Sequence, residues 1–376
     1  MIPPQKHLFN IPDNITYLNC AYLSPQLRSV QAAGIEGVSG KSSPWELMPQ
    51  DFFTESENCR ALFAELMEVN GENVVFIPSV SYGVALAAAN LEVKPGEEIL
   101  VLAEQFPSNY YAWENAAKHV GATIKTVPKT ADDCTAAVLE SITEKTAIAA
   151  IANCHWADGA LIDIQAVSDR CREFGAALVL DLSQSAGVIP IDFDRVKPDF
   201  VITVGYKWLL GPYSFGYMVI DEKYHEGNPL EHNWMAREDS EDFSRLVSYK
   251  DSFQPGARKF DVGERSNFVL MPMAIAALKQ ILKWDVGNIQ ETLLQLTDEM
   301  ANRATAFGLS FRDKKHRAPH ILGIQFQDGV PDKLTEKLKQ ENIYVSIRGN
   351  SMRIAPYLYN TEADIERLFS IIRKSL

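Results

Sequence analysis

The chain has 376 residues, of which 46% are hydrophobic and 23% are charged, and its formal net charge is −13. This composition is typical of a globular protein and excludes a disordered or fibrous chain. The acidic charge argues against a nucleic-acid partner, which selects a basic face. A chain of this length usually folds as two domains, each with its own core.

Cysteine usage and the N-terminus bear on the compartment. The five cysteines are an odd number and include no CxxC pair, which favours reduced thiols over disulfides or a zinc site. We therefore expect no bound metal. The first residues lack a basic segment followed by an apolar one, and no run approaches the ~18 apolar residues of a membrane span. These features predict a cytoplasmic protein without a membrane segment.

From about residue 60 to 220, helical patterns alternate with short apolar runs. The helix-like segments are Ser56–Val69, Gly83–Leu91, Ser108–His119 and Ile164–Phe174. The strand-like runs are Val74–Ile77, Glu98–Leu102, Thr123–Val127, Ala147–Ile151, Ala177–Leu180, Phe200–Val204 and Gly216–Ile220. Strands that alternate with helices predict an α/β fold with a mostly parallel, seven-stranded sheet covered on both faces.

A different pattern follows, after a segment from about His225 to Lys259 that lacks periodicity and reads as a long loop near the site or at a subunit interface. The later elements are a long helical stretch at Met271–Phe307, an apolar run at Ile321–Phe326, a helix at Pro331–Glu341, strands at Tyr344–Ile347 and Met352–Ala355, and a closing helix at Thr361–Lys374. Thr361 and Asp364 form a variant capping box. We expect a large domain at 16–265 and a small C-terminal α+β domain at 266–376. Residues 1–15 are expected to belong to the small domain.

Ligands of open α/β sheets bind beyond the carboxyl ends of the strands. The first such end, Val74–Ile77, is followed by Pro-Ser-Val-Ser-Tyr-Gly and a helix. Hydroxyls and free N–H groups at a helix N-terminus suit a phosphate, although Ser79 or Ser81 could also be a simple N-cap. The segment is not a Walker loop, because GxxxxGK[ST] is absent.

Two further strand ends carry a carboxylate and an aromatic ring. Asp181 ends an apolar strand, where it could accept a hydrogen bond from a protonated ring nitrogen or cap a helix. Phe106, in Gln-Phe-Pro-Ser-Asn, could stack on a flat cofactor ring or belong to the core.

The fourth strand end carries Lys207, which is followed by Trp-Leu-Leu. Lysine normally stays in water. Partial burial lowers the pKa of a lysine and makes its amine a nucleophile suited to Schiff-base chemistry. The alternative is a lysine whose stem lies on apolar neighbours while its amine stays in solvent.

A phosphate cradle, an aromatic plate, a carboxylate and a nucleophilic lysine are together the parts that hold pyridoxal phosphate. Here the chain resembles the class V aminotransferases of pyridoxal-phosphate fold type I, which include cysteine desulfurases, selenocysteine lyases and kynureninase-like enzymes. The resemblance runs from Tyr17-Leu-Asn-Cys-Ala to the segment that begins Arg353-Ile-Ala-Pro-Tyr. Its most specific parts are Asp181-x-x-Gln184 and Tyr206-Lys207.

The resemblance implies roles for the residues around the cofactor ring. Lys207 is expected to form the internal aldimine and to move the proton between the substrate α-carbon and the cofactor in a quinonoid intermediate. Asp181 is expected to pair with the pyridinium nitrogen, Gln184 to contact the phenolic oxygen, and Phe106 to stack on the ring where desulfurases carry His. Trp156 matches a residue at the cofactor's edge.

The resemblance also implies a phosphate site and a substrate site. Ser79, Val80 and Ser81 are expected to meet the phosphate, with Tyr206 as a further donor. Arg353 matches the arginine that binds the substrate carboxylate, a contact that guanidinium makes in bidentate fashion; the alternative is a surface arginine on a strand.

Some positions depart from the family pattern. The segment 344–353 contains no cysteine where desulfurases carry their nucleophile, which argues against persulfide chemistry. A Gly-Thr pair that reaches the partner subunit's phosphate is replaced by Gly263-Glu-Arg-Ser-Asn, so Ser266 or Asn267 would substitute. Val204 stands where many relatives have Ser.

The function expected from the resemblance is an aminotransferase acting on a small amino acid, in a homodimer. A lyase of the selenocysteine lyase, desulfurase or kynureninase kind, or an epimerase, is the alternative on the same scaffold. A non-catalytic cofactor-binding module is disfavoured by the presence of both Lys207 and Arg353. A nucleotide-binding Rossmann protein is disfavoured because no GxGxxG follows the first strand.

Overall fold

A seven-stranded sheet is the centre of the computed structural model, which describes residues 1–129, 133–326 and 328–375. In spatial order its strands are β2 (Val74–Ile77), β8 (Gly216–Ile220), β7 (Phe200–Val204), β6 (Ala177–Asp181), β5 (Thr146–Ala152), β3 (Glu98–Leu102) and β4 (Thr123–Val127). Within this sheet, β8 alone runs in the direction opposite to the other strands. The predicted α/β fold with a mostly parallel, seven-stranded sheet is confirmed.

Both faces of the sheet are buried, because successive side chains of a strand point to opposite sides. In β3, Leu100 and Leu102 join one hydrophobic cluster, whereas Ile99 and Val101 join the other. The first cluster includes side chains of α2 (Asp51–Met67), α5 (Cys134–Ser141), α6 (Ile164–Phe174) and α8 (Leu270–Trp284). The second includes side chains of α3 (Val80–Asn90) and α4 (Tyr111–Val120). The result is a three-layer arrangement.

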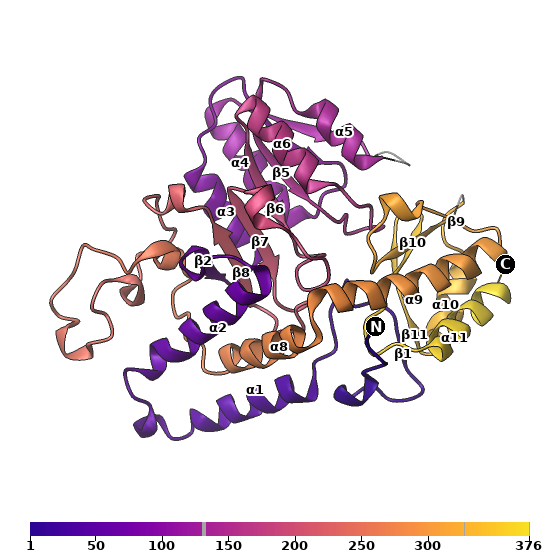
Figure 1. The fold of residues 1–376 in the computed structure, drawn as a ribbon, viewed down its shortest axis with the longest axis horizontal. Helices are drawn as coiled ribbons and strands as arrows, with labels where there is room; N and C mark the ends of the chain where they lie inside the picture. Colours follow the sequence, from indigo (N-terminus) through magenta and orange to yellow (C-terminus); the bar gives the residue numbers. More distant parts are fainter. Residues whose placement is uncertain (130–132, 327, 376) are drawn as a thin grey trace.

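Helix α1 (Arg28–Gly40) was not predicted, because glycines weaken its helical pattern. The same glycines bring its backbone close to the start of α8. A Cβ on Gly37 would lie 2.2 Å from the carbonyl oxygen of Phe268, and one on Gly34 would lie 2.8 Å from Met273 Sδ. Figure 1 shows α1, α2 and α8 together below the sheet. Tight packing therefore stabilises a helix that sequence propensity disfavours.

The C-terminal part carries a second, antiparallel sheet with its own hydrophobic cluster. Its strands, in spatial order, are β12 (Ser346–Arg348), β13 (Ser351–Ile354), β10 (Leu322–Gln325) and β9 (Ser310–Phe311), and its helices are α9 (Val286–Ala306), α10 (Asp332–Gln340) and α11 (Glu362–Arg373). A parallel pair, β1 (Thr16–Tyr17) and β11 (Ile343–Tyr344), ties the N-terminus to it. The predicted capping box of Thr361 and Asp364 is confirmed at the start of α11.

The stretch predicted as helical at Met271–Phe307 is two helices, because Asp285 has φ 69° and its side chain caps α9 at Asn288 N. The first of them, α8, packs on α1 and α2. The domain boundary between residues 265 and 266 stays a prediction.

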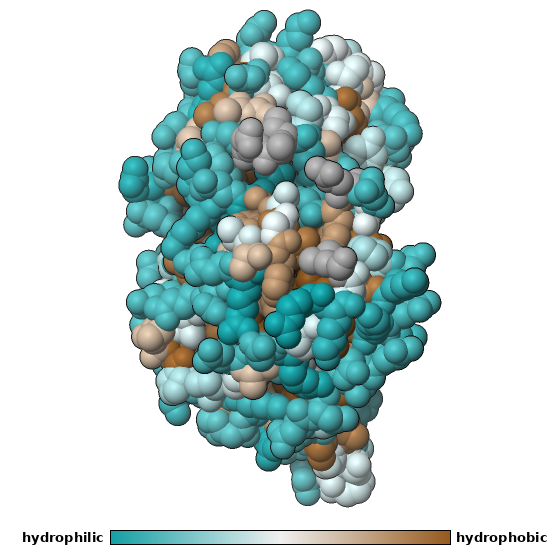
Figure 2. Space-filling model, turned by 90° about the vertical axis from the view of Figure 1, so that its right-hand side faces the viewer, coloured by the Kyte–Doolittle hydropathy of each residue, from teal (hydrophilic) through white to brown (hydrophobic). Residues whose placement is uncertain are grey.

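The segment between β8 and α8 extends from the side of the molecule opposite the C-terminal strands (Figure 1). Its described elements are short 3-10 turns at Glu222–Tyr224, Trp234–Ala236, Phe243–Arg245 and Gly256–Phe260. The face drawn in Figure 2 is mostly hydrophilic, with apolar side chains gathered near its centre. Among the described residues, no helix combines the length and apolarity needed to cross a membrane.

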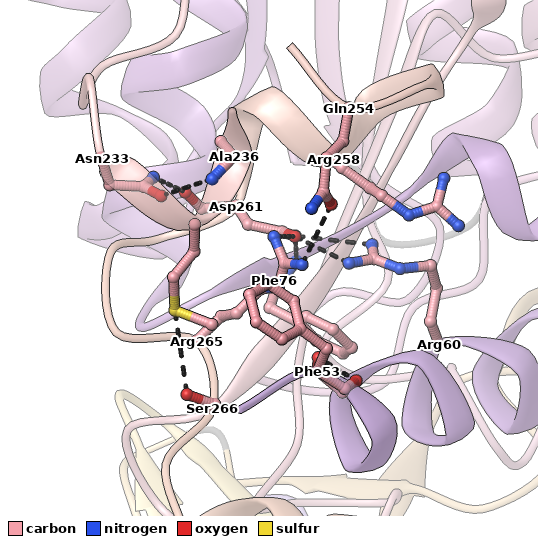
Figure 3. A network of polar contacts seen from close by, with 12 residues as sticks. Phe53, Arg60, Phe76, Asn233, Ala236, Gln254, Arg258, Asp261, Arg265 and Ser266 are labelled. Atoms are coloured by element: carbon pink, nitrogen blue, oxygen red, sulfur yellow. Dashed lines mark hydrogen bonds and ion pairs between the residues drawn. The ribbon is translucent and has the colours of Figure 1, made fainter. Parts of the chain in front are cut away.

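A buried ionic network fixes the chain where this segment returns to the sheet (Figure 3). Asp261 accepts hydrogen bonds from Arg60 Nη2 at 2.7 Å and from Phe76 N at 2.8 Å. It also forms an ion pair with Arg265 Nη1 at 3.2 Å. The side chains of these three charged residues are no more than 2% exposed. Asp261 is therefore the buried anion shared by two guanidinium groups, which also pair with Glu57, and it attaches the segment before Asn267 to β2 and α2.

Replacing Asp261 with Asn should destabilise the fold strongly. The substitution keeps the shape of the side chain but removes the buried anion shared by Arg60 and Arg265, which then keep, among the described residues, only the partly exposed Glu57 as an ion-pair partner. Breaking a buried ion pair in this way costs about 3–5 kcal/mol. Urea titration of D261N against the native protein measures the change. The control, Asp13→Asn, removes a fully exposed partner of Lys6 and should leave the midpoint unchanged. Equal midpoints for D261N and native protein would contradict the stated role of the network.

Candidate active site

A cavity of about 400 Å³ opens at the carboxyl ends of the parallel strands, the edge expected for a ligand. Its lining brings together residues that follow β2, β3, β5, β6 and β7. Of the predicted site residues, those that line it are Ser79, Val80, Ser81, Phe106, Trp156, Asp181, Gln184, Tyr206 and Lys207. Residues far apart in the sequence thus meet at one place because of the strand order.

Lys207 lies within this cavity and is only 8% exposed. Its Nζ lies 5.5 Å from the centroid of the Phe106 ring and 5.9 Å from that of Tyr206. Burial disfavours the charged amine and lowers its pKa to about 8, while the Asp181 carboxylate opposes the shift and the cation of Arg353 adds to it. A lysine whose amine stays in solvent is therefore excluded, and the side chain is a neutral nucleophile at mildly alkaline pH.

The N-terminus of α3 forms one wall of the cavity. Ser79 is the N-cap, since its Oγ accepts a hydrogen bond from Tyr82 N at 3.2 Å, and it also lies 2.9 Å from Ser81 Oγ. The N–H groups at the first two helical positions, Val80 and Ser81, have no intrahelical acceptor. N-capping and anion binding are therefore compatible here, because the cap uses the Tyr82 N–H and leaves the earlier ones for a phosphate.

Asp181 and Gln184 are held by their own neighbours. Asp181 Oδ1 accepts a hydrogen bond from Ser183 N at 2.9 Å. The Gln184 amide donates to Ala21 O at 3.0 Å and accepts from Trp208 Nε1 at 2.8 Å. Because an amide group has two N–H donors, Gln184 keeps one for a ligand while its orientation is fixed.

Phe106 and Trp156 form an aromatic wall. Their ring centroids are 5.6 Å apart at an interplanar angle of 78°, and Trp156 Nε1 donates to Glu104 O at 2.7 Å. Phe106 is 36% exposed, so the alternative that it belongs to the core is wrong. An exposed ring beside the lysine amine is available to a flat ligand.

Arg353 lies in an adjoining cavity of about 420 Å³. The residues that line both cavities are Phe106, Trp156, Gln184, Tyr206, Lys207 and Tyr213. Arg353 is 1% exposed, which rules out a surface arginine, and burial lowers its pKa to about 10. It donates to Trp156 O and, at 3.3 Å, to Ser346 Oγ, whereas its buried Nε has no hydrogen-bond partner among the described residues.

Ser266 and Asn267 do not line either cavity. Ser266 Oγ lies 3.8 Å from Met235 Sδ, and Asn267 Oδ1 caps α8 by accepting from Val269 N at 3.0 Å and Leu270 N at 2.9 Å. Within one subunit these side chains have structural partners, and a role at a phosphate stays a prediction that needs a second subunit.

Several lining residues were missed by the sequence reasoning. Gln105 Nε2 and Ser183 Oγ are buried in the cavity wall and have no hydrogen-bond partner among the described residues. Such groups normally find partners, so a polar ligand in the cavity would satisfy them. Ser183 lies inside the Asp181-x-x-Gln184 motif, which was a usable signal. No sequence signal pointed to Tyr213, because this residue reaches the cavity from the turn before β8.

The cavity suits pyridoxal phosphate by its chemistry. It combines a nucleophilic amine, a carboxylate at a strand end, an exposed aromatic ring, free N–H groups at a helix start and unsatisfied buried polar groups. On the α/β scaffold described above, these features define a pyridoxal-phosphate-dependent enzyme of fold type I.

The family comparison agrees with this definition. Residues 41–368 match the family model described as aminotransferase class-V. The chain belongs to the class V aminotransferase family of pyridoxal-phosphate-dependent enzymes, as the sequence resemblance predicted.

Relatives within the family have different activities in their names. The chain is 24% identical over 314 residues to an uncharacterized aminotransferase, YcbU, of Bacillus subtilis, covering 83% of this chain and 81% of the relative. It is 27% identical over 304 residues to a kynureninase of Deinococcus radiodurans, covering 77% and 71%.

Solved structures share the fold. The apo cysteine desulfurase of Thermococcus onnurineus matches with a TM-score of 0.85 and 16% identity, over 100% of this chain and 98% of that one. A mutant of C-DES with glycine covalently linked to its PLP cofactor matches with a TM-score of 0.86 and 17% identity, over 98% of each chain. The fold is therefore shared at identities too low to assign a reaction.

The depressed pKa of Lys207 predicts a specific pH profile in the cofactor-free protein. The amine reacts only when neutral. Labelling of Lys207 by an amine-directed reagent should therefore reach half its maximal rate near pH 8, whereas exposed lysines should reach it at about pH 10.4. Asp181→Asn removes the carboxylate that stabilises the charged amine, which should move this midpoint to lower pH. Mass spectrometry of the labelled peptides reads each lysine separately. A Lys207 midpoint at the exposed value would contradict the assignment.

Proposed function

We propose that the protein is an aminotransferase that acts on a small amino acid. The observation that carries the proposal is the buried Lys207 amine, which shares one cavity with the Asp181 carboxylate and the N-terminus of α3. Bound pyridoxal phosphate withdraws electrons from the substrate α-carbon. The protein's own groups must then anchor the cofactor, orient the substrate and move protons.

The cofactor contacts follow from the cavity walls. Asp181 would hold a proton on the pyridine nitrogen through a charge-assisted hydrogen bond. The free N–H of Gln184 would serve the phenolic oxygen, and Phe106 would stack on the ring. The N–H groups of Val80 and Ser81, with the hydroxyl of Ser79, would bind the phosphate, and Tyr206 would add a donor. Trp156 would contact the edge of the ring.

Substrate binding and proton transfer are assigned to one guanidinium group and one amine. Arg353 binds the substrate carboxylate, for which its unpartnered Nε is available. Its guanidinium is fixed by Trp156 O and Ser346 Oγ, so it orients the substrate without first reorganising. Lys207 Nζ would hold the cofactor and, as a free amine, would accept and return the proton of the substrate α-carbon.

A lyase is the second candidate, since relatives are named as kynureninase and cysteine desulfurase. Persulfide chemistry has little support here. The hairpin at 344–353 has no cysteine and closes through Gly349 and Asn350 alone. Cys154 lines the cavity, but burial raises the pKa of its thiol, so it stays protonated. A lyase reaction that needs no thiol remains as the alternative.

Substitution of Lys207 tests the attachment. The native protein should be yellow, and borohydride treatment should fix the cofactor to the peptide that contains Lys207. Lys207→Ala should lose this linkage and lower turnover by at least about 10²–10⁴-fold, the usual contribution of a positioned proton carrier. Lys259, which is also buried at 7% exposure but lies outside both cavities, provides the control K259A. Undiminished turnover in K207A would end the assignment.

Single-turnover screening with amino acids separates the two candidate reactions. Without an added amino acceptor, a transaminase should release one equivalent of 2-oxo acid per site and then stop. A lyase should continue and release alanine or another cleavage product. Substrate-dependent loss of the visible absorbance, followed in the same cuvette, identifies which amino acids bind. Continuous product release without an acceptor would replace the aminotransferase with the lyase.

The working form in this proposal is a cytoplasmic homodimer in which Ser266 or Asn267 reaches the partner subunit's phosphate site. Support comes from their position outside the cavities of their own chain and from exposed apolar side chains such as Ile35 and Trp45, at 61% and 77% exposure. Hybrids of K207A with a S266A/N267A chain test the exchange. If the contact crosses between subunits, each hybrid regains one intact site, and activity should reappear on mixing. Continued inactivity of verified hybrids would contradict it.

A further inference from the structure

Arg348 is a second arginine at the substrate cavity, on the same hairpin face as Arg353. In the register of β12 and β13, Ser346 is opposite Arg353 and Arg348 is opposite Ser351. Residues opposite each other, and residues two apart on one strand, share a face. Arg348 and Arg353 are therefore diagonal neighbours, a relation that places Cβ atoms roughly 7–8 Å apart. Both line the cavity of about 420 Å³ that also includes Lys207.

The contacts of Arg348 leave its charge uncompensated. Its Nη1 donates to Ile347 O at 2.8 Å, and its guanidinium lies 5.5 Å from the centroid of the Trp156 ring. Within the part of the chain that the structure describes, its buried Nε has no hydrogen-bond partner, and neither has that of Arg353. Neither arginine forms an ion pair with any carboxylate in the described part of the chain. No Asp or Glu among the described residues lines their shared cavity.

A pair of fully buried arginines elsewhere in this protein provides a contrast. Arg60 and Arg265 share the carboxylate of Asp261, whereas Arg348 and Arg353 share none. The two cations of the cavity also act on each other, since Arg348 lowers the pKa of Arg353 in addition to the effect of burial. Paired guanidinium groups that face a cavity without an internal anion are suited to an anionic ligand.

We propose that Arg348 makes the enzyme specific for an acidic amino acid, one with a carboxylate on its side chain. This rests on the proposed function, in which Arg353 binds the α-carboxylate. That contact uses the α-carboxylate of the substrate. The guanidinium of Arg348 is then available for a second anionic group, the carboxylate of the substrate side chain. The guanidinium of Arg348 lies over the ring of Trp156 and uses Nη1 for Ile347 O, so its Nε–H edge is left for a carboxylate, which guanidinium can bind in bidentate fashion.

The test compares dicarboxylates with a monocarboxylate in the cofactor-loaded enzyme by isothermal titration calorimetry. Succinate and glutarate carry two anionic groups and butyrate carries one, and none of them has an amine that could react. The native enzyme should bind the better dicarboxylate at least about tenfold more tightly than butyrate, a difference expected of one charged hydrogen-bonded pair. The two chain lengths distinguish an aspartate-sized from a glutamate-sized side chain.

Variants assign the difference to Arg348. Arg348→Gln should abolish the tenfold preference for the dicarboxylate and leave butyrate affinity within about twofold. Arg348→Lys keeps the charge and should retain part of the preference. Arg353→Gln should weaken all three ligands. The control Arg303→Gln removes a cation of α9 outside both cavities and should change nothing, which excludes a general effect of net charge.

The outcomes separate this inference from the proposed function. Equal affinities of the native enzyme for succinate, glutarate and butyrate would overturn the specificity and leave the role of Arg353 intact. The specificity is also overturned if R348Q weakens butyrate as much as the dicarboxylates, because Arg348 would then only maintain the cavity. If the native enzyme binds none of the three carboxylates, the proposed binding of the substrate carboxylate by Arg353 is contradicted as well.

Discussion

Burial of one lysine amine at the edge of a parallel sheet is the constraint on which the site depends. A lysine at 8% exposure is unfavourable unless its charge is removed or balanced. The protein does both in part: burial lowers the pKa of Lys207 to about 8, and Asp181 limits the shift. The carboxyl ends of β6 and β7 bring these two groups together, because adjacent parallel strands end at the same edge. The same edge receives the start of α3 and so adds an anion site.

Charge balance differs between the scaffold and the site. In the scaffold, the carboxylate of Asp261 sits between two buried guanidinium groups, and the result is a fixed connection between α2, β2 and the returning chain. In the cavity that Arg348 and Arg353 line, neither arginine has such an anion among the described residues. A neutralised pair adds rigidity, whereas an open pair favours a ligand that carries negative charge. This difference is what distinguishes a structural cluster from a binding one in the same chain.

The sequence predicts the sheet well because parallel strands buried on both faces are continuous apolar runs. Several strands, including β3 and β7, begin and end where the pattern places them. Helix α1 escapes prediction because its stability comes from the close approach of Gly37 to Phe268, which is a tertiary effect. Likewise, residues such as Gln105 and Arg348 carry no motif. Their importance lies in unsatisfied polar atoms, and satisfaction of a hydrogen bond depends on neighbours that only the folded chain brings near.

Chemistry and specificity reside on different parts of the fold. The proposed cofactor contacts come from the ends of the large sheet, while both arginines come from the β12–β13 hairpin of the C-terminal part. The hydrogen bond from Arg353 to Trp156 O joins the two, because Trp156 borders both cavities. A change in the hairpin can therefore alter which side chain is accepted without moving Lys207 or Asp181. On this view, the sheet edge supplies the chemistry, and the hairpin is where the substrate of this enzyme is selected.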